Sequence, residues 1–526
     1  MSCHLMADDA QSFSPVPEVF RFSPHAHQAH RIQWRAWGKA SFDEAIHKDK
    51  PIFLLLSSLW CQGCHLMDQT TLSEVRVIDI INADYIPIRV DCDLRPDINQ
   101  RYNQNGFPSV LLLSSEGEIL WGSVYLPPTK LLYYLGYMRR YYAEHHRNID
   151  TQIHSLHDQQ RIQMTHMRDT LEPVNLQDVP AVAMSVLRDL YDSENGGFTI
   201  HPSLKFPHPD ALEFLLTSPQ LSDHEKVCYS LTQMRDGGLW DHEAGGFFRY
   251  SSANDWSIPH TEKMLNENAA MLHLLLMVAK STGDEQWSQL ARQLVAYVNR
   301  TLWQGDTGAF SGSQCADEEY YEPGFYSRAS RAHPVVDIVI YTDWNAHMIS
   351  SYLLASHLLD DVSLREKALR ALDYLYEHMF SSQGCMFHYT IGGRSFLPAQ
   401  LSDQVWMIQA LLDAYATCRD ANYLEAARTL IQFVSQELWD TQNSLAYDYP
   451  DDAQAIGRLA TREQPLSENA LLAACAFRIA IIDQHVHFHE MALQILSACL
   501  NKYQQTGIYG ISYAHVVALA CEQRWL

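Results

Sequence analysis

Two hydrophobic patterns follow one another along this chain. In the N-terminal part, short continuous apolar runs alternate with stretches in which apolar residues recur every three or four positions. The runs are typical of buried strands, and the spaced stretches predict helices. We expect strands over 51–56, 85–90, 109–114 and 119–123, and helices over 34–48, 66–81 and 130–142. This order of elements predicts an α/β domain.

The later part of the chain is helical, and its pattern repeats. Each unit has an apolar helical stretch, a loop rich in glycine and aromatic residues, and a second helix that opens on polar residues. First helices are expected near 177–192, 222–236, 286–302, 363–380, 423–438 and 486–503. Second helices are expected near 208–217, 261–281, 343–358, 402–418, 467–482 and 511–522. Such hairpins in series predict an all-α (α/α)6 toroid, in which one helix of each pair lines the centre and the loops build a cleft at one mouth.

A polar stretch rich in His, Gln and Arg separates the two patterns. We therefore divide the chain into an α/β domain over 1–140, a linker helix over 141–175 and the toroid over 176–526. The length agrees with this division, because 526 residues exceed the roughly 250–300 at which a single core stops growing.

Charge and composition narrow the possible partners. The chain has 38 Lys and Arg against 62 Asp and Glu, a net charge of −24, so nucleic acid and anionic membranes are excluded as partners. We see no signal peptide and no apolar run long enough to span a bilayer. Eleven thinly spread cysteines, an odd number, are typical of free thiols. We expect a cytoplasmic protein.

Cys61 and Cys64 are the one closely spaced pair of cysteines, and they lie between a predicted strand and a predicted helix. Backbone N–H groups at a helix N-terminus stabilise a thiolate. We assign nucleophilic attack to Cys61 and resolution of the mixed disulfide to Cys64. The expected partner is then a protein disulfide or dithiol.

The residues around this pair carry a family resemblance. Trp60-Cys61-Gln62-Gly63-Cys64 resembles the thioredoxin active site, and Gly106-Phe107-Pro108 resembles the cis-proline loop that faces it. The resemblance implies that Pro108 positions the partner. Ser23-Pro24-His25, Lys50-Pro51-Ile52-Phe53 and Arg95-Pro96-Asp97-Ile98 resemble the thioredoxin-like domain of the spermatogenesis-associated protein 20 family.

Other interpretations of the cysteine pair stay open. Cys61 to His65 also has the form of a c-type haem attachment motif. A zinc site would need two ligands besides the cysteine pair, and His65 and Cys92 could contribute them. Leu55 stands where thioredoxins commonly bury an acid, so a thioredoxin fold with little redox turnover is a further alternative. Our prediction is that the chain uses neither a metal nor a cofactor.

The helical part resembles the same family, through motifs that include Lys205-Phe206-Pro207-His208-Pro209 and Gly245-Gly246-Phe247-Phe248-Arg249-Tyr250. It is also similar to six-hairpin glycosidases and N-acylglucosamine 2-epimerases, which implies carbohydrate metabolism. Convergent carboxylates, amides and aromatic side chains are what a polyhydroxylated ligand requires. The candidate cleft residues are His208, Trp240, Asp241, His242, Arg249, Trp256, His260, Glu262, Asp343, Trp344, Asn345, Asp403 and Glu468.

The cleft residues allow two reaction types. A glycosidase needs two flanking carboxylates, which could be drawn from Asp241, Glu262, Asp343, Asp403 and Glu468. A sugar epimerase would move a proton with histidine, which could be His208, His242 or His260. Helix capping and structural hydrogen bonding explain the same residues without catalysis.

Three functions follow from the sequence. The first is a thiol–disulfide oxidoreductase whose toroid recognises a carbohydrate or a glycosylated partner. The second is a carbohydrate-active enzyme, with the thioredoxin-like unit as a docking or redox-control domain. The third is a scaffold without enzymatic activity.

Overall fold

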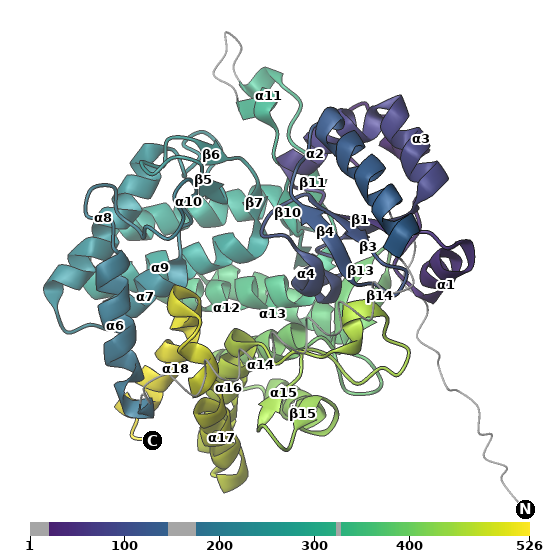
Figure 1. The fold of residues 1–526 in the computed structure, drawn as a ribbon. Helices are drawn as coiled ribbons and strands as arrows, with labels where there is room; N and C mark the ends of the chain where they lie inside the picture. The colour runs from purple at the N-terminus through teal and green to yellow at the C-terminus, as the bar shows by residue number, and fades with distance from the viewer. Residues whose placement is uncertain (1–19, 146–174, 322–327, 526) are drawn as a thin grey trace, which may run out of the picture.

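The computed structural model describes residues 20–145, 175–321 and 328–525 (Figure 1). Most of the predicted linker, residues 146–174, lies outside the described residues. The N-terminal part contains one four-stranded sheet in the order β2-β1-β3-β4. Its strands are β1 (Ile52–Ser57), β2 (Ile86–Asp91), β3 (Ser109–Leu113) and β4 (Ile119–Ser123). The four predicted strands are therefore confirmed, with β1 parallel to β2 and antiparallel to β3.

The apolar runs arise because both faces of this sheet are buried. Phe53 and Leu55 of β1 join a core that includes Ile78 and Leu131, whereas its alternate residues Ile52, Leu54 and Leu56 face a second core. The surrounding helices are α1 (Lys39–Lys48), α2 (Gln62–Gln69), α3 (Val75–Asp84), α4 (Pro96–Tyr102) and a helix over 128–145.

The helix predicted over 66–81 is two helices. It breaks after Gln69, and a 3-10 turn over Thr71–Ser73 leads into α3. The Thr71 hydroxyl donates to the Leu126 carbonyl at 2.7 Å, and this buried bond holds the turn against the chain that follows β4. The contact is long-range, so the helical spacing of the apolar residues does not reveal it.

The rest of the chain forms the predicted toroid. The outer helices are α6 (Val179–Leu190), α8 (Leu221–Gly237), α10 (Glu285–Thr301), α13 (Val362–Met379), α15 (Ala421–Phe433) and α17 (Val486–Tyr503). The inner helices are α7 (Pro209–Leu216), α9 (Leu265–Thr282), α12 (Thr342–Leu358), α14 (Leu401–Cys418), α16 (Leu466–Asp483) and α18 (Ile511–Glu522). Each inner helix contacts the next, and α18 contacts α7, so the ring is closed.

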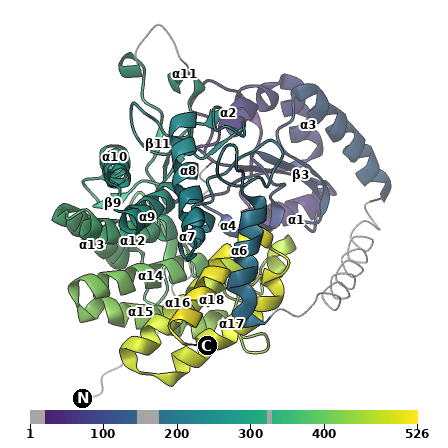
Figure 2. The same cartoon turned by 90° about the vertical axis from the view of Figure 1, so that its left-hand side faces the viewer.

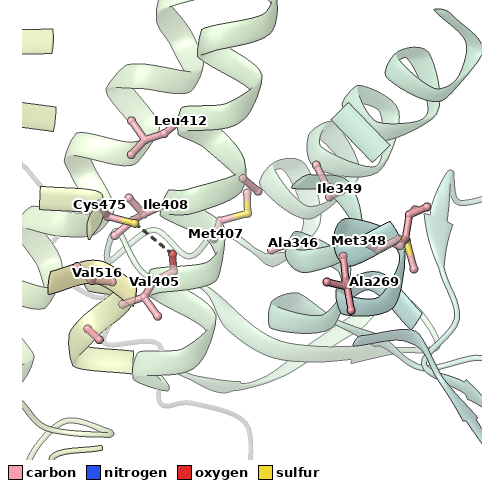
Figure 3. Packing of buried hydrophobic residues seen from close by; sticks show 14 of the residues in the cluster. Ala269, Ala346, Met348, Ile349, Val405, Met407, Ile408, Leu412, Cys475 and Val516 are labelled. Carbon is pink, nitrogen blue, oxygen red and sulfur yellow. Dashed lines mark hydrogen bonds between the residues drawn. The ribbon is translucent and has the colours of Figure 1, made fainter. Parts of the chain in front are cut away.

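The inner helices are buried on most sides, and small or flexible side chains fill the spaces between them. Figure 3 shows Ala269 of α9, Ala346 of α12 and Val405 of α14 among these residues. Interiors packed in this way tolerate few changes in volume. Among the described residues, none of the helices has the length and apolar composition needed to cross a membrane.

The N-terminal domain is seated against the helical ring (Figures 1 and 2). Arg101 of α4 donates to the Thr461 carbonyl at 2.9 Å and pairs with Asp448 at 2.8 Å. The Tyr102 hydroxyl, also on α4, accepts from the Arg458 amide at 2.9 Å. The apolar residues Tyr449 and Leu459 of the toroid join the second core of the sheet, so apolar contacts also hold the two parts together.

Candidate functional site

The cysteine pair lies at the start of α2, as the sequence predicts. Cys61 is the N-cap residue, and its Sγ accepts the Cys64 amide at 3.1 Å. The Phe107–Pro108 peptide bond is cis, in agreement with the resemblance of this loop to the thioredoxin cis-proline loop. Cys61 therefore lies at the helix N-terminus and Cys64 one turn further on, and a Cβ on Gly63 between them would lie 3.3 Å from Pro108 of the facing loop.

The toroid covers this pair. Cys61 and Cys64 are only 4% and 3% exposed. They share a buried cluster with Met264 and Cys315 of the toroid, and Trp344 packs against it. The Ala316 amide also donates to the Trp60 carbonyl at 3.0 Å. The face that a thioredoxin-like domain offers to a partner protein is therefore occupied by the same chain.

Burial also raises the pKa of two thiols in this region, Cys64 and Cys92. Desolvation, followed by interactions with Cys61, raises the pKa of Cys64 well above its ordinary value. The pKa of Cys92 is raised by burial and by Asp91. Cys64 is thus a protonated thiol at neutral pH in this arrangement, as a resolving cysteine is before it attacks.

Arg249 of the toroid contacts Trp60, the residue before the cysteine pair. Its guanidinium lies 4.3 Å from the ring centroid of Trp60, and its Nε donates to Glu267 at 3.1 Å. Glu262 lies 4.0 Å from the same guanidinium and is 2% exposed. Burial raises the pKa of Glu262 to about 7, although Arg249 opposes this change.

Two adjoining cavities lie inside the ring. The mouth cavity, of about 390 Å³, is bordered by Arg249, Glu267 and Trp344, among others. The central cavity, of about 1100 Å³, runs along the inner helices. His347 and Trp406 border both, so the two cavities are neighbours. Together they offer the aromatic and polar lining that small-molecule sites share.

The central cavity contains a cluster of titratable groups. His273 lies 3.3 Å from Glu213. Burial disfavours the charged forms of both residues, but the attraction between them outweighs this effect. The pKa of His273 is therefore raised and that of Glu213 is lowered. His347 stacks on Trp406 at 4.2 Å, and burial, followed by His273, lowers its pKa to about 3. The cavity therefore pairs a charged imidazolium–carboxylate couple with a neutral imidazole.

Asp343, His388 and Asp403 form a second cluster beside the mouth cavity. Their potential ligand atoms lie within 4.8 Å of one another, as a metal site requires. However, His388 Nδ1 lies 3.0 Å from Asp403, and its Nε2 lies 2.8 Å from the Asp93 carbonyl, which can only accept. Both ring nitrogens therefore donate. His388 is an imidazolium paired with Asp403 rather than a group with a free lone pair for a metal.

Electrostatics agree with this protonation. Asp403 outweighs the effect of burial and raises the pKa of His388 to about 10. Burial and the neighbouring Asp403 raise the pKa of Asp343 to about 7. Asp343 is the member of this cluster that borders the mouth cavity. It is suited to take up or release a proton near neutral pH.

Five of the predicted cleft residues border the cavities. His208, Arg249, Asp343 and Trp344 line the mouth cavity, and Glu468 lines the central one. Burial lowers the pKa of His208 to about 4. Their roles in catalysis or binding stay predictions.

The other predicted residues have structural neighbours. Glu262 and Asp403 are fully buried beside Arg249 and His388. Asp241 pairs with Lys263 at 2.8 Å, and His260 stacks on Tyr250 at 4.2 Å. Trp240, Trp256 and Asn345 are buried in the core and do not border either cavity. His242 is exposed, and its Nε2 lies 3.0 Å from the Arg235 carbonyl.

Sequence reasoning did not find the central cluster. Glu213, His273, His347, Trp406 and His515 lie inside the inner helices, whereas the sequence drew attention to the first turns. A signal was available, because His273 interrupts the apolar run of α9 with a single ionisable residue. Such a residue is unexpected in a buried helix unless it lines a cavity or has a partner.

The fold and the cysteine pair define a class: a thioredoxin-like domain joined to an (α/α)6 toroid. Residues 22–172 match a family model described as "Protein of unknown function, DUF255". The N-terminal domain is a thioredoxin-like DUF255 domain.

The chain is homologous to spermatogenesis-associated protein 20. It is 23% identical to the human protein over 545 residues, which covers 79% of this chain and 69% of the relative. It is 29% identical to the mouse protein over 317 residues, which covers 55% of this chain and 39% of that protein.

Solved structures show the fold of the helical part. The cellobiose 2-epimerase of Bacillus thermoamylovorans B4167 superimposes with a TM-score of 0.50 at 12% identity, covering 61% of this chain and 85% of that enzyme. A D-mannose isomerase gives a TM-score of 0.50 at 11% identity, covering 62% and 87%. At these identities, the likeness establishes the toroid.

Proposed function

We propose that this protein is a carbohydrate-active enzyme whose toroid moves a proton on a sugar, and that the thioredoxin-like domain forms the roof of its site. The observation that carries the proposal is the central cluster: the Glu213–His273 pair beside the neutral His347, which lies on Trp406. The likeness of the fold to an epimerase and an isomerase of sugars supports the same class of reaction.

The lining suits a polyhydroxylated ligand. Trp344 and Trp406 provide flat apolar faces, and Asn266 Oδ1 and Glu267 Oε2 are buried acceptors without a hydrogen-bond partner within the described part of the chain. A buried acceptor without a partner is costly, and a ligand hydroxyl would satisfy it. The net charge of −24 also favours a neutral ligand over an anionic one.

The proposed reaction is general acid–base catalysis. A neutral imidazole such as His347 accepts a proton from the carbon next to a sugar carbonyl, and a protonated group such as His273 donates to the carbonyl oxygen. To give an epimer, a second acid delivers a proton to the opposite face of the same carbon, and the former carbonyl oxygen returns its proton to His273. To give an isomer, His347 delivers its proton to the former carbonyl carbon, and the hydroxyl on the first carbon loses its proton to become the new carbonyl. Glu213 keeps His273 protonated.

Deuterium incorporation tests this proposal. The full chain is incubated in D₂O with a panel of aldoses, ketoses and disaccharides chosen by thermal shift, and deuterium in the recovered sugar is measured by mass spectrometry. We expect His347→Gln to lower exchange by about a hundredfold or more. His242→Gln, which alters an exposed histidine outside the cavities, should leave it unchanged. Absence of exchange into every sugar would contradict the proposal.

A second function has its own supporting observation. Cys61 at the N-terminus of α2, with the Cys64 amide on its Sγ and Pro108 opposite, has the arrangement expected of a thiol–disulfide oxidoreductase. Because the toroid covers the pair, a protein partner would require the domains to separate. Insulin reduction by wild type and Cys61→Ser tests this, with Cys418→Ser as an exposed control. Equal activity of all three proteins argues against it.

A further inference from the structure

We propose that the redox state of the Cys61–Cys64 pair and the binding of a ligand in the mouth cavity are thermodynamically linked. Oxidation of the pair would change the ligand affinity, and the ligand would change the reduction potential of the pair by the corresponding amount. The ligand class, a carbohydrate, rests on the proposed function, but the physical connection between the two places does not.

The first connection is a shared wall. Trp344 borders the mouth cavity on one side and packs against the buried cluster of Cys61, Cys64 and Cys315 on the other. This aromatic side chain therefore joins the buried cluster that contains the thiols to the lining of the ligand space. A change in the volume around the sulfur atoms is transmitted directly, because packed interiors do not deform freely.

The second connection runs through the residue before Cys61. Trp60 is 3% exposed and holds the Arg249 guanidinium against its ring at 4.3 Å. Arg249 in turn donates to Glu267, and both residues border the mouth cavity. A shift of Trp60 thus moves the cation that balances the acidic groups of the cavity.

The third connection is a chain of hydrogen bonds from Trp60. Its Nε1 donates to the Asp93 carboxylate at 2.9 Å, and the Asp93 carbonyl accepts from His388 at 2.8 Å. His388 pairs with Asp403, whose carboxylate accepts the Asp343 amide at 3.3 Å. Asp343 borders the mouth cavity. The thioredoxin-like domain therefore fixes the position of His388, which lies next to this carboxyl, through the Asp93 carbonyl.

Oxidation acts at the start of these connections. Two thiols lose two electrons and two protons to an external disulfide, such as glutathione disulfide, which is reduced to two thiols. The bond that forms joins Cys64 Sγ to Cys61 Sγ, the atom that accepts the Cys64 amide in the reduced pair. The first turn of α2 must adjust, and Trp60, which is adjacent in sequence, is held by Ala316 of the toroid. The adjustment therefore reaches the cavity rather than solvent.

The test measures both halves of the linkage on the full chain. Isothermal titration gives Kd for the sugar selected by thermal shift, with protein reduced by dithiothreitol or oxidised by glutathione disulfide. We expect Kd to differ by about fivefold or more. Saturating sugar should then shift the midpoint potential by about 20 mV or more, because a tenfold change corresponds to about 30 mV for two electrons.

Two arginine variants and a hydrogen-exchange measurement without sugar serve as controls for this test. Arg249→Met should reduce the redox effect on Kd, whereas Arg139→Met, an exposed residue of the helix over 128–145, should not. Hydrogen exchange without sugar should differ between redox states at the first turns of α9 and α12. If no sugar binds, the proposed function fails and hydrogen exchange alone decides the linkage. Equal exchange in both states would overturn the linkage, as would equal Kd values.

Discussion

Single buried charges join the two domains. Arg21 is almost fully buried, and its Nε and Nη1 donate to Asp91 of the sheet at 2.6 Å and to Asp337 of the toroid at 2.7 Å. A guanidinium in this position donates hydrogen bonds to one buried carboxylate from each domain and offsets part of their negative charge. One residue thus stabilises both the N-terminal domain and its attachment.

We predict that Arg21→Ala lowers the free energy of unfolding by about 3–5 kcal/mol, because it leaves two buried carboxylates without the cation that pairs with them. Arg139→Ala serves as the control, because Arg139 is 63% exposed in its ion pair with Asp84, and its loss should cost about 1 kcal/mol or less. Urea unfolding measures both. Equal losses in the two variants would contradict the assigned role of Arg21.

Glu262 predicts a pH dependence of stability. Its pKa is raised by burial from 4.5 to about 7, so the unfolded state ionises first as pH rises. Below pH 4.5, Glu262 is protonated in both states and does not change the free energy of unfolding. Between pH 4.5 and 7, it lowers that free energy by about 3 kcal/mol, because the unfolded state ionises more readily. Glu262→Gln should therefore be more stable than wild type at pH 8 and equal to it at pH 4. Chemical unfolding across this range, with Glu243→Gln as an exposed control, measures the difference.

At the scale of elements, amide side chains fasten four of the inner helices, α9, α12, α14 and α16, to the loops before them. Asn345 Oδ1 accepts the Phe310 amide at 2.8 Å, and its Nδ2 donates to the Phe310 carbonyl at 3.0 Å. The same paired bonds recur at Asn268 with Phe247, Gln404 with Met386 and Asn469 with Ala446. The recurring polar residues at the starts of these helices thus include structural clamps.

Removal of one clamp should be costly. Asn345→Ala leaves the Phe310 amide and carbonyl buried without partners, so we expect a loss of about 3 kcal/mol in the free energy of unfolding. Asn266→Ala is the control: its Oδ1 has no partner within the described residues, and its loss should cost less than about 1 kcal/mol. Thermal unfolding of both variants provides the comparison, and an unaffected Asn345→Ala protein would refute the clamp.

At the scale of the whole molecule, the two domains approach each other closely at Gly457. Gly457 of the toroid has φ +59°, and a Cβ there would lie 2.5 Å from the Tyr102 hydroxyl and 3.4 Å from Gly117 Cα. Such close approach requires glycine on the toroid side. The contact supports the docking that covers the cysteine pair.

Gly457→Ala should therefore loosen the roof. We expect alkylation of Cys61 by a maleimide to accelerate about tenfold or more in the folded protein, because the domains can no longer approach as closely. Gly392→Ala is a matched control, since Gly392 also has φ +59°, but a Cβ there would meet no atom of the described residues within 4 Å. Peptide mass mapping locates the label. Equal rates in the two variants would show that this contact does not hold the roof.

Local patterns were sufficient for much of the fold. The strand over 119–123 and the helix over 511–522 have the predicted bounds, because each depends on the spacing of its own apolar residues. The break after Gln69 was not predicted, because it depends on the bond from Thr71 to Leu126. The same limit applies to the site: Cys61 and Cys64 stand out as a motif, whereas Glu213 and His273 come together from separate helices.

The sequence by itself determined the two classes of domain, the position of the cysteine pair at a helix start and the acidity that disfavours nucleic acid, because these depend on near neighbours or on composition. Only the tertiary structure decided that Met264 and Cys315 cover that pair, and that Asn345 clamps a loop. It also decided which histidines line the cavities. Burial and ion pairing are set by residues distant in the chain, so they emerge when the ring closes and the domains dock.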